Sequence, residues 1–200
     1  AKNPRAISRR PLTLAAYRRL PYLATPLRTA DCAPPAAGAA AFVMTSRAAA
    51  PRSRRPPIAV RGTMQCGLPS TARQLCEWFA ADRDRALATV ARALFRAARV
   101  RPSDVDLVYL WNGISALALL GLEHYGFCRR GQAVAFVRGG GLRGLALNPH
   151  GGQLAEADLD GINDLIDAVD RLRGGRAKLA LVAGSPLEPT SAVLLGRDRP

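Results

Sequence analysis

The chain has 200 residues, 48% of them hydrophobic, and is long enough to bury the core of one domain, or of one domain and part of another. No apolar run approaches the ~20 residues that a membrane-spanning helix needs, so we predict no membrane span. The formal net charge of +14 is uneven: residues 1–61 hold 12 Lys and Arg and one acid, whereas residues 62–200 hold 17 Lys and Arg and 14 acids.

The first third of the chain predicts little regular structure. Residues 11–20 could form a short helix that Thr13 caps. Residues 38–46 are a short apolar run after a glycine, which predicts a buried strand. Residues 47–57 are rich in Arg and Pro and predict a linker, after which residues 58–62 predict another strand.

The middle of the chain predicts a helix, a strand and a second helix. Apolar side chains recur at helical spacing at Leu87, Val90, Ala91, Leu94 and Phe95. Asp82 or Asp84 can cap this helix, and Pro102 ends it. A buried strand at 106–111 then turns at Asn112 and Gly113 into residues 114–127. That segment is apolar on nearly every face, which predicts a buried helix.

The last third predicts glycine-rich loops, one helix and two strands. Residues 129–147 read as loops around the apolar run 133–137. The helix covers 162–173, with Gly174 as its C′ residue and an apolar face formed by Ile162, Leu165, Ile166, Val169 and Leu172. Strands at 178–184 and 191–196 can form a hairpin. The order of elements predicts a mixed α/β layer fold without internal repeats.

The stretch "LNPHGGQLAEADLDG", residues 147–161, concentrates glycine and acid in an arginine-rich chain. Its Gly-Gly pair could let the backbone approach a ligand, and Asn148 could fix the turn; an ordinary glycine turn is the alternative. Asp158 and Asp160 either favour the positive end of the following helix or include a general base. His150 lies in this loop, whereas His124 lies on an apolar helix as a core residue.

The basic N-terminal third would suit nucleic acid or a phosphate-bearing ligand. A coding bias toward arginine and alanine also explains it, because Lys2 and Lys178 are the only lysines. No zinc-finger spacing or RNA-binding aromatic motif accompanies the arginines. We therefore favour the bias and predict no nucleic-acid partner.

The cysteines form no CxxC pair and the two histidines are not spaced for zinc, so we predict no metal site. Residues 1–10 lack the apolar run of a signal peptide, and the chain does not begin with Met, so we expect a fragment or a processed chain. We predict a reduced, cytoplasmic protein. The four cysteines are expected to be small buried residues, not nucleophiles: Cys32, Cys66, Cys76 and Cys128.

Five groups of residues, in the same order as in the family, resemble the C-terminal half of the thiolase superfamily. The likeness is to the lipid-transfer-protein (sterol-carrier) thiolases and their thiolase-like acyl-CoA aldolases, and it covers nearly the whole chain. The groups are "KNPRA" with "PLTLAAY", "TPLRTADCAPPAAGAAAFVMTS", "DVDLVYLWNGISALALLGLEHYGFCRRGQ", "LALNPHGGQLAEA" and "AVDRLRGG".

The resemblance implies a layered α/β/α/β/α fold built from two similar halves. Residues 1–57 would be the tail of the N-terminal domain with a linker, and residues 58–200 the C-terminal domain. It implies carbon–carbon bond cleavage or acyl transfer on acyl-CoA thioesters, in lipid or steroid side-chain metabolism. CoA would enter as part of the substrate, with no other cofactor. The aldolase branch uses tyrosines and pairs with an OB-fold partner of the DUF35 type, and full-length members are commonly homodimers.

The resemblance breaks at positions that carry catalysis in the family. Asp158 stands ten residues after Asn148, where thiolases have a catalytic His and the aldolases a Tyr. Trp111 and Asn112 stand where the family's Tyr-Asp-Gly-Phe-Ser block has its Tyr and Asp. Ala37 replaces a usual Asp, and the Cys-x-Gly of thiolases is missing from "LVAGSPLEP".

Three functional interpretations follow. In the first, the chain is an acyl-CoA lyase or acyltransferase in which Asp158 is the base, Tyr109 supplies a phenol and Asn112 completes the catalytic set. The residues expected to contact the substrate are then Asn148, His150, Gly151, Gly152 and Trp111. In the second, the chain is a catalytically degenerate subunit that binds acyl-CoA or an OB-fold partner. In the third, it binds nucleic acid.

Overall fold

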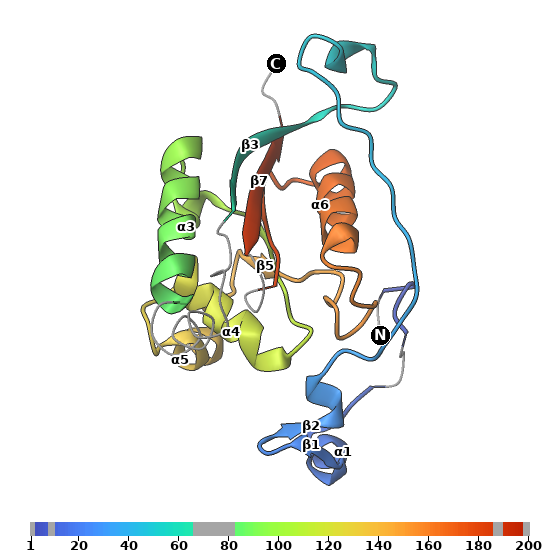
Figure 1. The fold of residues 1–200 in the computed structure, drawn as a ribbon, viewed down its shortest axis with the longest axis vertical. Helices are drawn as coiled ribbons and strands as arrows, with labels where there is room; N and C mark the ends of the chain where they lie inside the picture. Colours follow the sequence, from blue (N-terminus) through green and yellow to red (C-terminus); the bar gives the residue numbers. More distant parts are fainter. Residues whose placement is uncertain (1–2, 8–10, 66–82, 186–189, 198–200) are drawn as a thin grey trace, which may run out of the picture.

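A mixed five-stranded sheet lies at the centre of the computed structural model, which describes residues 3–7, 11–65, 83–185 and 190–197 (Figure 1). The strand order is β3-β7-β6-β4-β5, with β4 parallel to β5 and β6, and β7 antiparallel to β3 and β6. This topology confirms the mixed α/β class and the predicted β6–β7 pairing. The strands are β3 (Ile58–Gln65), β4 (Leu107–Leu110), β5 (Ala146–Leu147), β6 (Leu179–Ala183) and β7 (Ser191–Arg197).

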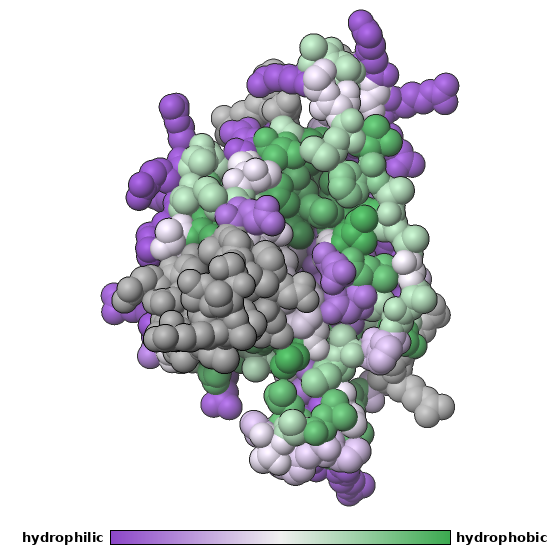
Figure 2. Space-filling view, viewed as in Figure 1, coloured by the Kyte–Doolittle hydropathy of each residue, from purple (hydrophilic) through white to green (hydrophobic). Residues whose placement is uncertain are grey.

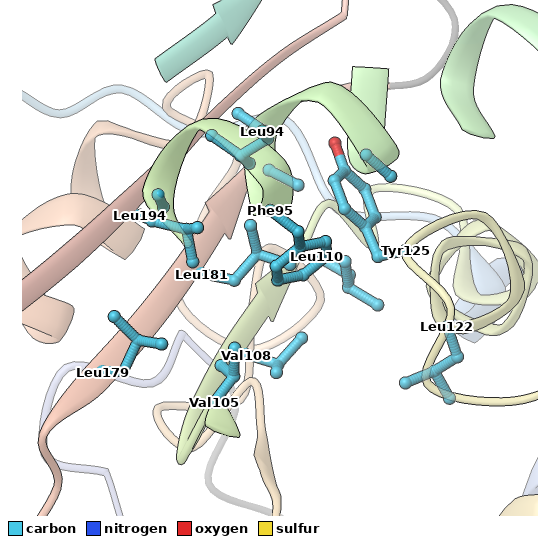
Figure 3. Packing of buried hydrophobic residues seen from close by; sticks show 14 of the residues in the cluster. Leu94, Phe95, Val105, Val108, Leu110, Leu122, Tyr125, Leu179, Leu181 and Leu194 are labelled. Atoms are coloured by element: carbon cyan, nitrogen blue, oxygen red, sulfur yellow. The ribbon is translucent and has the colours of Figure 1, made fainter. Parts of the chain in front are cut away.

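Helices cover both faces of the sheet (Figure 1). One face carries α3 (Arg83–Ala98), α4 (Ser115–His124) and α5 (Ala133–Arg138), and the other carries α6 (Ile162–Gly174). Figure 3 shows the core of the first face, where Leu94 and Phe95 of α3 pack near Leu110 of β4. Alternate residues of β4 point to opposite faces, so Val108 and Leu110 join this core while Leu107 and Tyr109 join the core under α6.

The helix α3 buries the face that its sequence predicts. Its apolar residues at helical spacing, Leu87, Val90, Ala91, Leu94 and Phe95, are all buried. The capping residues proposed for it, Asp82 and the side chain of Asp84, lie outside the described residues. Pro102 opens the short 3-10 turn η4 (Pro102–Asp104) beyond the helix end.

The helix α6 begins at the predicted residue and ends one residue later than predicted, and its predicted apolar face is buried only in part. Gly174 is its last residue and Gly175 caps it. Of the five apolar residues expected to face inward, only Leu172 is fully buried. The other buried side chains are Asn163, Asp164, Asp167 and Ala168. Leu165 and Val169 do pack against the core around Leu172. The sequence did not predict the burial of the polar side, which the loop 148–157 covers.

The N-terminal third forms a small lobe and a long connection to the sheet (Figure 1). The lobe contains α1 (Leu14–Arg19), whose cap Thr13 accepts a hydrogen bond from Ala16 N at 3.1 Å as predicted. It continues through β1 (Tyr22–Ala24), β2 (Leu27–Arg28) and the 3-10 turn η1 (Thr29–Asp31). A further 3-10 turn, η2 (Ala50–Arg52), lies in the predicted linker at the opposite end of the molecule.

The strand predicted at 38–46 is wrong. This segment is extended, but no described strand pairs with it. Its apolar side chains are consequently in water: Phe42 is 52% exposed, Met44 74% and Val43 94%. An apolar run after a glycine cannot distinguish a strand with partners from an extended chain without them.

Two expectations for the middle of the chain also need correction. The helix α4 is not buried all round: Leu117, Ala118 and Leu122 are buried, and the remaining side chains are half-buried or exposed. The predicted loop region 129–147 contains α5 and β5, which pack its apolar residues against the sheet and α4.

Candidate active site

The loop 148–161 is fastened to the carboxyl end of β4 by the side chain of Asn148. Leu110 N donates to Asn148 Oδ1 at 2.9 Å, and Asn148 Nδ2 donates to Leu110 O at 2.9 Å. The amide thus satisfies both backbone groups of Leu110, as a neighbouring strand would. Asn148 itself has φ 41°, a left-handed conformation that asparagine tolerates better than most residues.

A second amide fastens the loop one residue beyond Trp111. Asn112 N donates to Gln153 Oε1 at 2.9 Å, and Gln153 N donates to Asn112 Oδ1 at 2.7 Å. Both residues are buried. These reciprocal bonds hold the turn that follows β4 against the loop.

The second glycine of the Gly-Gly pair makes this contact possible. Gly152 has φ 66°, and a Cβ atom there would lie 2.2 Å from Asn112 Oδ1. Gly151 has φ 104° and is exposed. The pair therefore has a structural reason: one glycine admits the Asn112 side chain, and both need conformations that side chains disfavour.

Trp111 and Asp158, two of the positions where the family resemblance breaks, are in direct contact. The indole Nε1 lies 3.1 Å from both Asp158 Oδ1 and Asp158 Oδ2, so a single N–H is shared between the two carboxylate oxygens. Asp160 N also donates to Asp158 Oδ1, at 3.2 Å. Both side chains of the pair are half-buried. The Trp111 ring lies over Gly113, where a Cβ atom would meet Cζ2 at 2.2 Å.

N-terminal segments line the surroundings of this pair. Ala33 N donates to Gly113 O at 2.8 Å, and Asp31 accepts from Ser115 Oγ at 2.8 Å. Leu159, next to Asp158, packs on Gly38, whose missing Cβ atom would lie 3.0 Å from Leu159 Cδ1. The site is therefore built from three parts of the chain.

His150 is only 2% exposed and points into α6. Its Nε2 lies 2.8 Å from Asp164 Oδ1, without the alignment of a hydrogen bond, and its Nδ1 lies 3.9 Å from Asp167 Oδ2. The carbonyl of His150 accepts from Asn3 Nδ2 at 2.8 Å. Its imidazole therefore supports the loop from beneath, on the side away from water.

Tyr109 is fully buried, with its ring centroid 5.4 Å from that of His150. Its hydroxyl donates to Asp167 Oδ2 at 2.7 Å, and the same oxygen accepts from Arg171 Nε at 2.5 Å. Burial, reinforced by the hydrogen bond to Asp167, raises the pKa of the Tyr109 phenol far above its usual value. The phenol that we considered for catalysis is thus engaged in the interior.

A third buried acid, Glu156, connects the loop to the N-terminal segment. It accepts from Asn3 Nδ2 at 2.5 Å and from Arg5 Nε at 2.9 Å. Arg5 also reaches Asp167, with Nη2 3.5 Å from Oδ1. The sequence interpretation missed Gln153, Glu156, Asp164 and Asp167. The spacing of Asp164 and Asp167 on one side of α6 was the available signal, and it resembles an ordinary solvated face.

Several other expectations concern binding. The described residues contain no group of His, Cys, Asp and Glu that could hold a metal ion. Their helices are all too short or too polar to cross a membrane. Cys32 and Cys128 are free and half-buried, while the other two cysteines lie outside the described residues. A hollow of about 410 Å³ beside Arg171 and Arg176 lies at the amino end of β4, away from Trp111, and is not part of this site.

Comparison with known proteins identifies the family. A model described as thiolase C-terminal domain-like matches residues 73–185, which is more than half of the chain. The chain belongs to this thiolase C-terminal domain-like family. The thiolase-like resemblance inferred from the sequence motifs is thereby confirmed.

Curated members of the thiolase-like group show the same relationship. A 17-hydroxy-3-oxo-4-pregnene-20-carboxyl-CoA lyase of Mycobacterium tuberculosis is 31% identical over 98% of this chain and 54% of its own length. A steroid side-chain-cleaving aldolase of Thermomonospora curvata is 31% identical over 100% of this chain and 54% of its own. The chain therefore spans about half the length of these relatives.

Solved structures confirm the thiolase-like fold. A structure described as Ltp2-ChsH2(DUF35) aldolase superposes with a TM-score of 0.85 at 28% identity, over 99% of this chain and 55% of that one. The agreement extends over the N-terminal lobe and the sheet together, because nearly the whole chain is covered.

Proposed function

We propose that this chain is the C-terminal part of a thiolase-like lyase that cleaves a carbon–carbon bond of a β-hydroxy acyl-CoA, of the steroid side-chain class. The contact between Trp111 and Asp158 carries the proposal. It joins, in one half-buried place, two of the positions at which the family resemblance puts catalytic groups. The names of the two relatives at 31% identity support the substrate class.

In this proposal Asp158 is the general base of a retro-aldol cleavage. Its carboxylate takes the proton of the β-hydroxyl, the Cα–Cβ bond breaks, and Cβ becomes a carbonyl carbon. The electron pair of that bond forms the thioester enolate, which takes the proton back at Cα. The products are a ketone or aldehyde and a shortened acyl-CoA, with no oxidant or reductant consumed.

Trp111 orients the base, because its N–H is shared between both carboxylate oxygens. The loop from Asn148 to Gly152 would lie beside the thioester, with Gly151 exposed to it. Asn112, His150 and Tyr109 hold this loop from inside and do not contact the substrate. CoA is part of the substrate, and the proposal needs no cofactor.

A catalytically degenerate subunit is the second candidate, favoured by a specific observation. The indole of Trp111 cannot act as the acid or base that the family's tyrosine provides. Its N–H also donates to Asp158, the carboxylate that would replace the family's catalytic His or Tyr. In that case the chain would bind acyl-CoA or an OB-fold partner without turning substrate over.

The assembly is also a proposal. The similar solved structure is described as an aldolase with a DUF35 component. We infer that this protein pairs with a DUF35-type OB-fold partner, and that its longer form is a cytoplasmic homodimer. Residues 1–57 would then belong to the end of a preceding thiolase-like domain, and residues 58–200 would form the C-terminal domain.

The test is cleavage of β-hydroxy acyl-CoA and of 3-oxoacyl-CoA by the longest natural form, with and without an OB-fold partner. We expect cleavage of the β-hydroxy substrate, and a loss of about 10²-fold or more in kcat for Asp158→Asn. Asp160→Asn is the matched control, because Asp160 is exposed two residues away. Turnover that survives in Asp158→Asn would exclude Asp158 as the base, and no turnover under any pairing would favour the degenerate subunit.

A further inference from the structure

Trp111 is held between two amide clamps, one on each neighbouring residue. Asn148 binds both backbone groups of Leu110, and Gln153 binds the backbone N–H of Asn112. Both clamps come from the loop that also carries Asp158. The indole and the carboxylate that it binds are therefore placed by the same loop, residues 148–158.

Gln153 is fully buried and uses both ends of its side-chain amide. Its Oε1 accepts from Asn112 N at 2.9 Å, and its Nε2 donates to Asp164 Oδ2 at 2.7 Å. The Asp164 carboxylate fixes which end of the amide points to Asn112, because only the NH₂ end can donate to it. A reversed amide would place a donor against the Asn112 N–H.

The second carboxylate oxygen of Asp164 contacts His150. Asp164 is 1% exposed, lies on α6, and has its Oδ1 2.8 Å from His150 Nε2. A chain of buried polar side chains therefore runs from α6 through Asp164 and Gln153 to the turn beside Trp111. The side chains of His150, Asp164 and Gln153 do not themselves hydrogen-bond to Trp111 or Asp158.

We propose that Gln153 and Asp164 are positioning residues of the Trp111–Asp158 pair. Through their hydrogen bonds they hold the turn after β4 in place relative to α6, so that the indole N–H stays aligned with both carboxylate oxygens of Asp158. The inference rests on the proposed function for its effect on turnover. The structural part of the inference is that the contact between Trp111 and Asp158 loosens when Gln153 is replaced. This loosening can be measured even in a protein without catalytic activity.

The structural measurement uses Trp111 as its own reporter. Trp78→Phe leaves Trp111 as the only tryptophan of the chain. In that background, Gln153→Met keeps the side-chain length but loses both hydrogen bonds. We expect acrylamide quenching of Trp111 fluorescence to rise about twofold, in the same direction as with Asp158→Ala, which removes the acceptor of the indole N–H. Asp170→Asn, on the exposed side of α6, is the control and should leave quenching unchanged.

If Gln153→Met does not fold, as judged by circular dichroism, Asp164→Leu replaces it; this variant keeps the approximate side-chain size but offers no acceptor to Gln153 Nε2, and it should raise quenching in the same direction. In the cleavage assay, either variant should lower kcat about tenfold with KM nearly unchanged. Folded variants with unchanged quenching would overturn the inference, whether or not the protein cleaves acyl-CoA. Raised quenching in a protein that has no activity would uphold the positioning role and contradict the proposed function alone.

Discussion

Asn148 and Gln153 each bind the backbone beside Trp111, and Gly152 is the residue that lets the second of these contacts form. Polar amides are suited to this task because each carries a donor and an acceptor and can replace a missing strand partner. The carboxylate of Asp158 is half-buried at the edge of this loop, where a substrate could contact it.

Gly152→Ala should destabilise the protein more than replacement of a glycine with open space around it. The new Cβ atom would displace the Asn112 side chain, and the left-handed φ of 66° adds strain. We expect a loss of about 2–4 kcal/mol in the free energy of unfolding, measured by urea denaturation. Gly144→Ala is the matched control, with φ 84° and nothing within 4 Å of the new atom; it should cost about 1–2 kcal/mol. Equal losses in the two variants would mean that the Asn112 contact contributes nothing.

Tyr109→Phe should cost about 1–2 kcal/mol, because the buried Asp167 loses a donor at 2.7 Å while it keeps Arg171 and Arg5. Under the proposed function, kcat should fall no more than stability explains, since the phenol does not face the substrate. Thermal unfolding and the cleavage assay together test this. A loss of turnover in a variant of wild-type stability would return Tyr109 to the catalytic set.

At the scale of elements, the sequence predicted most helices and strands, and it predicted α3 with its buried face. It failed where burial depends on a neighbour that local pattern does not reveal. Asp164 and Asp167 look like a solvated stripe on α6, and only the loop folded over them makes them interior. Residues 38–46 look like a buried strand, and only the absence of a paired strand among the described residues leaves Val43 in water. The pairing of Trp111 with Asp158 could not be predicted for the same reason: 47 positions separate them.

The N-terminal lobe is attached to α4 through one carboxylate. Asp31 accepts from Tyr17 Oη at 2.7 Å, from Arg28 N at 2.8 Å and from Ser115 Oγ at 2.8 Å. Burial alone would raise the pKa of Asp31, but these hydrogen bonds outweigh it and hold the pKa below its usual value. Asp31 therefore ties α1 and η1 to the start of α4 most firmly when it is ionised.

Because the folded-state pKa of Asp31 is lowered, its contribution is fully present above its ordinary value and is lost as the pH falls through the lower folded-state value. We therefore expect the lobe to loosen below about pH 4. Asp31→Asn should show the loosened lobe at pH 7, with faster tryptic cleavage after Arg18 or Arg19 in α1. Asp104→Asn is the control, because Asp104 lies in η4 on the sheet domain. Cleavage at the wild-type rate in Asp31→Asn would show that backbone contacts, such as Ala33 N to Gly113 O, suffice to hold the lobe.

At the scale of the whole molecule, two kinds of surface stand out. Basic side chains project from the end where the linker 47–57 lies, as Figure 2 shows in purple. Apolar side chains lie exposed in the N-terminal third, in the lobe and along the extended segment: Leu12, Leu14, Tyr22, Leu23, Phe42, Val43 and Met44. The apolar exposure has the stronger consequence, because exposed apolar surface promotes association while like charges keep copies apart.

We therefore expect the 200-residue chain to self-associate through its extended segment, more strongly as salt screens its net charge of +14. Val43→Ser combined with Met44→Ser removes the two most exposed apolar side chains of that segment, 94% and 74% in water. The weight-average mass from light scattering should fall toward the monomer's 21.3 kDa, with the unfolding midpoint unchanged because neither side chain is buried. Val134→Ser, at a position 50% exposed on α5, is the control and should leave the mass as it was. If the double variant associates like the parent and the lobe variant Leu14→Ser does not, copies of the chain associate through the lobe and not through the extended segment.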